Sequence, residues 1–167
     1  MKKIRFMFAL FCSKFTRMVL KLLGKQASFY PGLIALKIDK DYLRGACRFK
    51  KIICITGTNG KTTTTNMVSD ILSNTEYKIA NNKLGANIDT GIATVITNGL
   101  SLFCKPKVDI LVLETDEKFS RIIFSYIKPD YLIVTNLSRD SIKRNAHSEF
   151  IFNILNNICN TWFFIAN

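Results

Sequence analysis

Apolar residues recur in five short runs beyond residue 50, and the segments between these runs carry helix-type spacing. The runs predict strands at 52–56, 77–80, 108–113, 131–135 and 162–166. The intervening segments predict helices at 61–72 and approximately at 87–98, 117–126 and 141–159. Strands that alternate with helices are typical of an α/β fold, in which a parallel sheet carries helices on both faces. Ligands of such sheets bind at the carboxyl ends of the strands.

The first 23 residues mix apolar and basic side chains in a helical pattern that ends at Gly24. On a helix, five basic residues fall within about 80° of one another; they are Lys3, Lys14, Arg17, Lys21 and Lys25. The apolar run 6–12 is too short to span a bilayer, and it lacks the pattern of a signal peptide. Two interpretations remain open. Either this helix packs on its own domain with the basic stripe in water, or residues 1–24 lie on an anionic membrane surface.

The net charge of +12 supports a separate N-terminal extension, because it is unevenly distributed. Residues 1–51 carry thirteen Lys and Arg against two Asp, a balance of +11, whereas residues 52–167 have a balance of +1. A nearly neutral domain argues against nucleic acid as a partner. The five cysteines are scattered without a C-x-x-C pair. They predict neither a zinc site nor disulfides, which fits the cytoplasm, and Cys54 and Cys159 are predicted to be small buried side chains.

The first predicted strand leads into a glycine-bracketed turn, a lysine and a threonine cluster, which predict a phosphate-binding loop at a helix N-terminus. The loop consists of Gly57, Thr58, Asn59, Gly60, Lys61, Thr62 and Thr63. Its glycines allow a tight turn, its lysine suits the β- and γ-phosphates, and the Thr62 hydroxyl suits Mg²⁺. Ile55 stands where the G-x-x-x-x-G-K-[ST] pattern has its first glycine. The alternative is a Gly/Asn turn that binds nothing.

Two further polar clusters follow predicted strands. Glu114 directly follows the apolar run 108–113, so a magnesium role is predicted for it. Asp116 and Glu117 are instead predicted to be charges at a helix N-terminus. In the cluster 135–140, Arg139 and Asp140 either cap the next helix or contribute to the site. The only histidine, His147, is predicted to be an exposed helix residue.

The phosphate loop has the form found in Mur ligases and their relatives. Other ordered motifs, at 31–39, 84–87, 91–94, 113–117 and 135–140, resemble one branch of that superfamily. This branch is MurT, the Mur ligase-like subunit of lipid II isoglutaminyl synthase. The resemblance runs from about Gly32 to the end of the chain. It implies three parts: a basic amphipathic helix and linker (1–30), an entry segment (31–50) and a Mur ligase central domain (51–167).

This resemblance implies an ATP-dependent amide ligase. ATP would phosphorylate the α-carboxyl of D-glutamate in the lipid II stem peptide, and ammonia from a glutaminase partner subunit would then give D-isoglutamine. It also implies that Lys61 contacts phosphate, that Thr62 and Glu114 hold Mg²⁺, and that Asn87 lies near the nucleotide. Lys61 and Glu114 are thus the expected catalytic residues. The expected location is the cytoplasm, at the inner face of the membrane where lipid II lies.

Three departures from the branch pattern lead to a second expectation. Residues 141–147 replace the expected motif, a four-cysteine zinc ribbon is absent, and so is the C-terminal domain. The chain is therefore expected to be the truncated N-terminal part of a longer ligase and inactive by itself, with Zn²⁺ only in the missing downstream part. Two alternatives stay open: an ATP-binding remnant or regulatory module without ligase activity, and another Mur-type amino-acid ligase.

Overall fold

A computed structural model describes residues 2–82, 87–116 and 119–136, together with the backbone of 162–164. Five parallel strands form one sheet in the order β2-β3-β1-β4-β5. Their bounds are β1 Lys51–Thr56, β2 Ile79–Asn81, β3 Ile110–Glu114, β4 Tyr131–Val134 and β5 Trp162–Phe164. The α/β fold with a parallel sheet is therefore confirmed, with the nucleotide-type loop after the central strand.

Six helical elements accompany the sheet in the described residues. They are α1 Lys2–Leu22, α2 Tyr30–Ile38, the 3₁₀ helix η1 Tyr42–Arg48, α3 Lys61–Ser73, α4 Asp89–Gly99 and α5 Ser120–Tyr126. Most predicted bounds agree within two residues, but α5 begins three residues later than predicted. Strand β3 begins at Ile110 rather than 108, and Asp109 bonds to Lys50, just before β1, and to Lys78, just before β2. The predicted helix at 141–159 lies outside the described residues.

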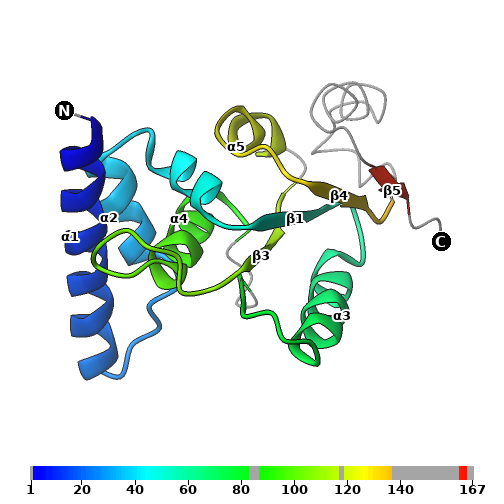
Figure 1. Ribbon diagram of the computed structural model, residues 1–167, viewed down its shortest axis with the longest axis horizontal. Helices are drawn as coiled ribbons and strands as arrows, with labels where there is room; N and C mark the ends of the chain where they lie inside the picture. The colour runs from blue at the N-terminus through cyan, green and yellow to red at the C-terminus, as the bar shows by residue number, and fades with distance from the viewer. Residues whose placement is uncertain (1, 83–86, 117–118, 137–161, 165–167) are drawn as a thin grey trace, which may run out of the picture.

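Helices cover both faces of the sheet, as the alternation of strands and helices predicts. One face buries Cys54 of β1 and Leu111 of β3 against α4 and α5. The other face buries Ile55 and Val112 against α3. In Figure 1, α3 lies below the sheet and α5 above it. Cys54 is fully buried, as predicted, whereas Cys159 lies outside the described residues.

The N-terminal helix α1 packs on its own domain, as the first of its two interpretations expects. Phe6 and Leu10 join the same buried cluster as the central strands. The Ser13 hydroxyl lies 2.8 Å from Pro31 O at the start of α2 and 2.8 Å from Thr97 Oγ1 in α4. Helix α2 approaches α4 so closely that a Cβ on Gly32 would collide with the Thr90 carbonyl. Figure 1 shows α1 at the edge of the molecule, with its outer side facing away from the sheet.

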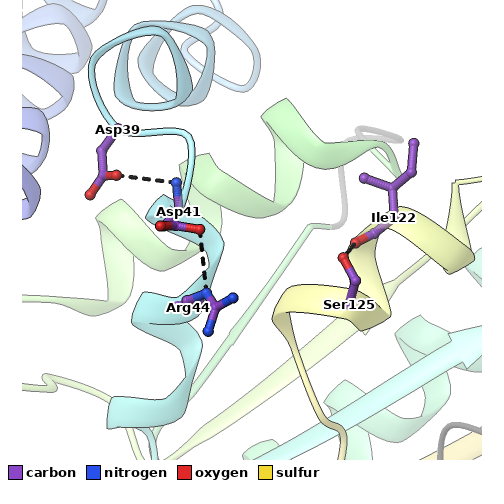
Figure 2. Close-up of polar contacts among 5 residues, drawn as sticks. All are labelled: Asp39, Asp41, Arg44, Ile122 and Ser125. Carbon is purple, nitrogen blue, oxygen red and sulfur yellow. Dashed lines mark hydrogen bonds and ion pairs between the residues drawn. The ribbon is translucent and has the colours of Figure 1, made fainter. Parts of the chain in front are cut away.

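The entry segment 31–50 forms α2 and η1, which the sequence pattern did not predict. The turn between them is ordered by Asp39, whose carboxylate accepts a 3.1 Å hydrogen bond from Asp41 N. Asp41 in turn forms a 3.4 Å ion pair with Arg44 (Figure 2). The Arg44 guanidinium lies 5.7 Å from the Tyr126 ring centroid of α5, the helix on which Ser125 Oγ donates to Ile122 O. This segment therefore packs against α5 as part of the scaffold.

Candidate functional site

The phosphate-type loop lies where the chain diverges to opposite faces of the sheet. After β1 the chain enters α3 on one face, and after the neighbouring β3 it enters α5 on the other. Such a divergence between adjacent parallel strands leaves a crevice at their carboxyl ends, which is where open α/β sheets bind ligands. The loop residues 57–60 and the end of β3 lie at this edge of the sheet.

Gly57 gives the loop its conformation through both its backbone angle and its lack of a side chain. Its φ of 131° belongs to the region that L side chains rarely adopt. A Cβ at this position would collide with Thr135 Oγ1 and would lie 2.7 Å from Asn136 O. Gly60, with φ 80°, precedes the first residue of α3. Both glycines are therefore required by the turn, as the sequence predicted.

The end of β4 holds the loop from the side. Thr58 N donates to Asn136 O at 2.9 Å, and Asn59 N donates to the Asn136 side chain at 2.9 Å. The Thr135 hydroxyl donates to Asn59 O at 2.6 Å. Sequence reasoning noted Thr135 and Asn136 only as part of a polar cluster, and these contacts between distant segments give them a positioning role.

Lys61 lies at the start of α3, and its ammonium donates to the carbonyls of Gly57 and Thr58. The loop thus holds this positive charge close to the helix N-terminus. Thr62 and Thr63 follow in the first turn, whose N–H groups have no acceptor in a preceding helical turn. The lysine and the positive end of the helix dipole together make this point favourable for a polyphosphate.

The two predicted magnesium ligands, Thr62 and Glu114, lie in direct contact. Thr62 Oγ1 is 3.1 Å from one carboxylate oxygen of Glu114 and 3.0 Å from the other. Glu114 is only 3% exposed and pairs with Ile55 in the register of β1 and β3. A hydroxyl beside a carboxylate is a set of hard oxygen donors that suits Mg²⁺, an ion that keeps several waters and takes few protein ligands. The described part of the chain contains no cluster of three or more His, Cys, Asp or Glu.

Asn82 supports this carboxylate from the neighbouring strand. Its side-chain amide donates to Glu114 O at 2.8 Å, and its side-chain oxygen accepts from Glu114 N at 2.8 Å. Asn82 follows β2 directly and is 5% exposed. Sequence reasoning missed it, although the two asparagines that follow the predicted strand 77–80 were the available signal. Asn87 lies close by, because its carbonyl accepts a 3.0 Å hydrogen bond from Asp116 N.

Other predicted residues do not join this arrangement. Asp116 is not a first-turn charge of α5, because that helix begins at Ser120 and has no acidic residue in its first turn. Instead, the Asp116 carbonyl accepts a 3.1 Å hydrogen bond from Phe119 N in the turn before the helix. Glu117, Arg139, Asp140 and His147 lie outside the described residues.

A cavity of about 350 Å³ lies on the α1 side of Asn82. Two basic residues of α1 and several amides and hydroxyls line it, among them Arg17, Lys21, Asn81, Asn82, Thr94 and Asn98. This lining is positively charged and rich in hydrogen-bonding groups. The basic stripe of α1 is therefore divided, since Arg17 and Lys21 line this cavity, which is open to solvent.

Comparison with known proteins places this site in a family. Residues 55–161 match the model of the Mur ligase middle domain. The chain is 36% identical over 146 residues to the lipid II isoglutaminyl synthase (glutamine-hydrolyzing) subunit MurT of Streptococcus pneumoniae strain R6, covering 87% of this chain and 32% of that protein. It is 34% identical over 154 residues to the corresponding subunit of Staphylococcus aureus strain COL, covering 92% of this chain and 34% of the relative. The chain thus spans about a third of the length of these curated relatives.

A solved structure shares the fold at lower sequence identity. The MurF ligase of Thermotoga maritima, solved in complex with ADP, aligns with a TM-score of 0.60 and 17% identity, over 78% of this chain and 36% of that one. The family match begins at Ile55, near the end of β1, and spans the loop at 57–63, Thr62 and the whole of β3 with Glu114. On this evidence the chain belongs to the Mur ligase family, carries its middle domain, and is similar over most of its length to MurT subunits.

Proposed function

We propose that this chain is the ATP-binding part of an ATP-dependent amide ligase subunit of peptidoglycan synthesis. The observation that carries the proposal is the contact between the Thr62 hydroxyl and both carboxylate oxygens of Glu114, beside the loop that holds Lys61. Similarity to MurT subunits supports the reaction class. The ADP in the Thermotoga MurF complex supports the choice of nucleotide.

The proposed reaction has two steps. The α-carboxylate of D-glutamate in the lipid II stem peptide attacks the γ-phosphorus of ATP, and ADP leaves. Ammonia then attacks the acyl carbon, the C–O bond to phosphate breaks, phosphate leaves and the nitrogen loses a proton, which gives D-isoglutamine. A glutaminase partner subunit would supply the ammonia, in keeping with the glutamine-hydrolyzing description of the relatives. The proposed location is the cytoplasm, at the inner face of the membrane, with no role for nucleic acid.

The chain's own residues would act mainly by positioning and by charge. The backbone of 57–63 would surround the phosphates, and Lys61 would offset the charge that spreads over the transferring phosphoryl oxygens. Thr62 and Glu114 would hold Mg²⁺, which supplies further charge neutralisation when bound. Asn82 would keep Glu114 in place, and Asn87 would lie near the nucleotide. The remaining chemistry needs the acceptor and the ammonia to be held within reacting distance.

A second candidate is an ATP-binding module that ligates nothing. The observation that favours it is that Lys61, Thr62 and Glu114 lie together, a set of groups that suffices to bind a nucleotide with Mg²⁺. Both candidates require the same nucleotide site, so a binding experiment tests what they share. A measurement of amide formation then distinguishes the ligase from the module that only binds ATP.

Isothermal titration of the 167-residue chain with ATP, with and without Mg²⁺, tests the nucleotide site. We expect Lys61→Ala to weaken binding about ten- to a hundredfold, which is the loss of one charge-assisted contact. Glu114→Gln should remove the dependence on Mg²⁺ while leaving metal-free binding in place. Lys105→Ala, which changes a lysine in the loop after α4, is the control and should bind as the unaltered chain does. Unchanged ATP affinity in Lys61→Ala would contradict the site.

A further inference from the structure

Helix α1 has two apolar faces, and the fold uses only one of them. The inner face packs Phe6, Ala9 and Leu10 into the domain core. The outer face carries a second stripe of six large apolar side chains, each between 51% and 79% exposed. We call these the outer stripe; they are Ile4, Phe8, Phe11, Phe15, Met18 and Leu22.

The spacing of the outer stripe is that of a single helix face. Its members follow one another at intervals of three or four residues, so all six lie within about 40° of one line along the helix. The centre of this line is opposite Ser13, the residue that bonds to α2 and α4. Single exposed apolar residues are normal on a protein surface, but a contiguous row of six indicates an interaction site. Because the inner face already holds α1, the stripe is not needed for docking the helix.

Basic residues flank this stripe without any acidic residue nearby in the sequence. Lys3 and Lys21 lie on one flank of the helix, Lys25 follows just beyond its end, and the first acidic residue of the chain is Asp39. On the same flank, Lys14 donates to Thr97 O at 2.8 Å, so it also fixes α1 to α4. A positive border beside an apolar stripe complements a surface that is apolar inside and anionic at its rim.

The loop after α4 adds a second exposed apolar group close to α1. Leu102 and Phe103 are 55% and 82% exposed. The pKa of the Lys14 ammonium is lowered first by its own burial and then by the charge of Lys107, which belongs to the same loop. The loop is therefore close to α1. This loop thus combines exposed apolar side chains with lysines, as the outer face of α1 and its flank do.

We propose that the outer face of α1 binds the surface of an anionic phospholipid bilayer. The helix would lie in the plane of the membrane, with the outer stripe at the level of the acyl chains and the flanking lysines among the headgroups. No helix in the described part of the chain is long and apolar enough to cross a bilayer. The contact is therefore peripheral and reversible. It rests on the surface of α1 and goes beyond the proposed ligase function, since it needs neither nucleotide nor acceptor.

Co-sedimentation with vesicles tests this proposal. The 167-residue chain is mixed with phosphatidylglycerol–phosphatidylcholine vesicles or with phosphatidylcholine alone, at about 0.1 M and about 1 M salt, where the screening length is about 10 Å and about 3 Å. The test variant is Phe8→Ser/Phe11→Ser/Phe15→Ser. Its matched control is Met67→Ser/Ile71→Ser, which removes two apolar side chains of α3 that are 59% and 65% exposed. Lys3→Gln/Lys25→Gln tests the charged border, and circular dichroism checks that each variant keeps its helices.

We expect the unaltered chain and the α3 control to sediment with anionic vesicles, less at high salt, and hardly with neutral ones. The affinity of the triple serine variant for the anionic vesicles should be lower by about a hundredfold or more. The lysine variant should sediment less with anionic vesicles and should show a smaller salt dependence than the unaltered chain. Recovery of the unaltered chain in the supernatant would overturn the proposal, as would equal sedimentation of the triple variant.

Self-association and nucleotide binding of the same variants are measured alongside. Dimers that form without vesicles and disappear in the triple serine variant would assign the stripe to a second copy of the chain and overturn the proposal. ATP titration separates this inference from the proposed function. Retained ATP binding with lost vesicle binding in the triple serine variant supports a membrane role that is independent of the nucleotide site.

Discussion

The side-chain amide of Asn82 forms two 2.8 Å hydrogen bonds with the backbone of Glu114, one to its carbonyl oxygen and one from its N–H. This pairing continues the contact between β2 and β3 past the last ladder position, which joins Asn81 to Val112. Glu114 is thereby fixed on one side by Asn82 and on the other by its register with Ile55 of β1. Its carboxylate is left to face the Thr62 hydroxyl.

Asn82→Ala should therefore lower both stability and magnesium-dependent nucleotide affinity. The substitution leaves two buried backbone groups of Glu114 without partners, so we expect a loss of about 1–3 kcal/mol in the free energy of unfolding. Chemical denaturation measures this loss, and titration with ATP and Mg²⁺ measures the binding. Asn74→Ala is the control, because the Asn74 side chain forms an exposed bond to Asp70 O, away from the site. Equal Mg²⁺-dependent affinity in both variants would show that Asn82 does not position Glu114.

Gly57→Ala should destabilise the chain more than Gly24→Ala does. Both residues have a positive φ, but the 66° of Gly24 lies in the left-handed helical region, where a side chain costs about 1–2 kcal/mol, whereas the 131° of Gly57 lies outside it, in conformations that L side chains rarely adopt. A Cβ at Gly24 would meet nothing within 4 Å, whereas one at Gly57 would collide with Thr135 and Asn136. The difference in melting temperature between the variants therefore combines the larger backbone penalty at Gly57 with the crowding there. Combining Gly57→Ala with Thr135→Ala should recover part of the loss, and no recovery would assign the whole effect to the backbone angle.

The 167-residue chain should bind ATP but form no amide by itself. Its described residues supply contacts for phosphate and Mg²⁺, whereas acyl-phosphate chemistry also needs the acceptor and the ammonia in near-attack positions. Incubation with ATP, Mg²⁺, an ammonium salt and a D-glutamate-containing lipid II stem peptide, followed by mass spectrometry, checks this. The ammonium salt removes any need for a glutaminase, so ATP-dependent amide formation would contradict the prediction directly.

The sequence predicted those features that depend on neighbouring residues. Gly57, Gly60 and Lys61 act within one turn between a strand and a helix, so their spacing alone indicates a phosphate-type loop. The strands were recognisable because buried parallel strands form nearly continuous apolar runs. Glu114 could be placed beside Thr62 because the carboxyl ends of parallel strands meet at one edge of the sheet.

Contacts between distant segments were beyond the reach of sequence pattern. Asn136 holds the loop across 77 positions of sequence, and Asn82 reaches Glu114 across 32. Neither the register nor the strand order that joins these residues is encoded in local spacing. Helix α2 was missed because it has only nine residues, and its hydrophobicity extends around most of its surface. The two apolar faces of α1 were likewise hidden, because periodicity shows a stripe but not which stripe the domain covers.

The stability of the chain should rise with pH between about 8 and 10.5 through Lys14. Burial, followed by the nearby charges of Lys107 and Arg17, lowers the pKa of Lys14 from 10.5 to about 8. In that window the unfolded chain binds more protons at this site than the folded chain does, so deprotonation favours the folded state. Below about pH 8 both states are protonated, and the unfavourable contribution of the part-buried ammonium is present in full.

Melting temperatures of the unaltered chain and of Lys14→Met, measured from pH 7 to pH 11, test this contribution. As pH rises from about 8 to about 10.5, the melting temperature of the unaltered chain should rise relative to that of Lys14→Met, because the variant has no ammonium that can lose a proton. Lys25→Met removes a lysine from the chain just beyond α1 and controls for the change in net charge. Lys107→Ala removes a neighbouring positive charge, so it should shift the start of the rise to higher pH. A difference between Lys14→Met and the unaltered chain that stays constant over the whole range would mean that Lys14 titrates alike in the folded and unfolded states.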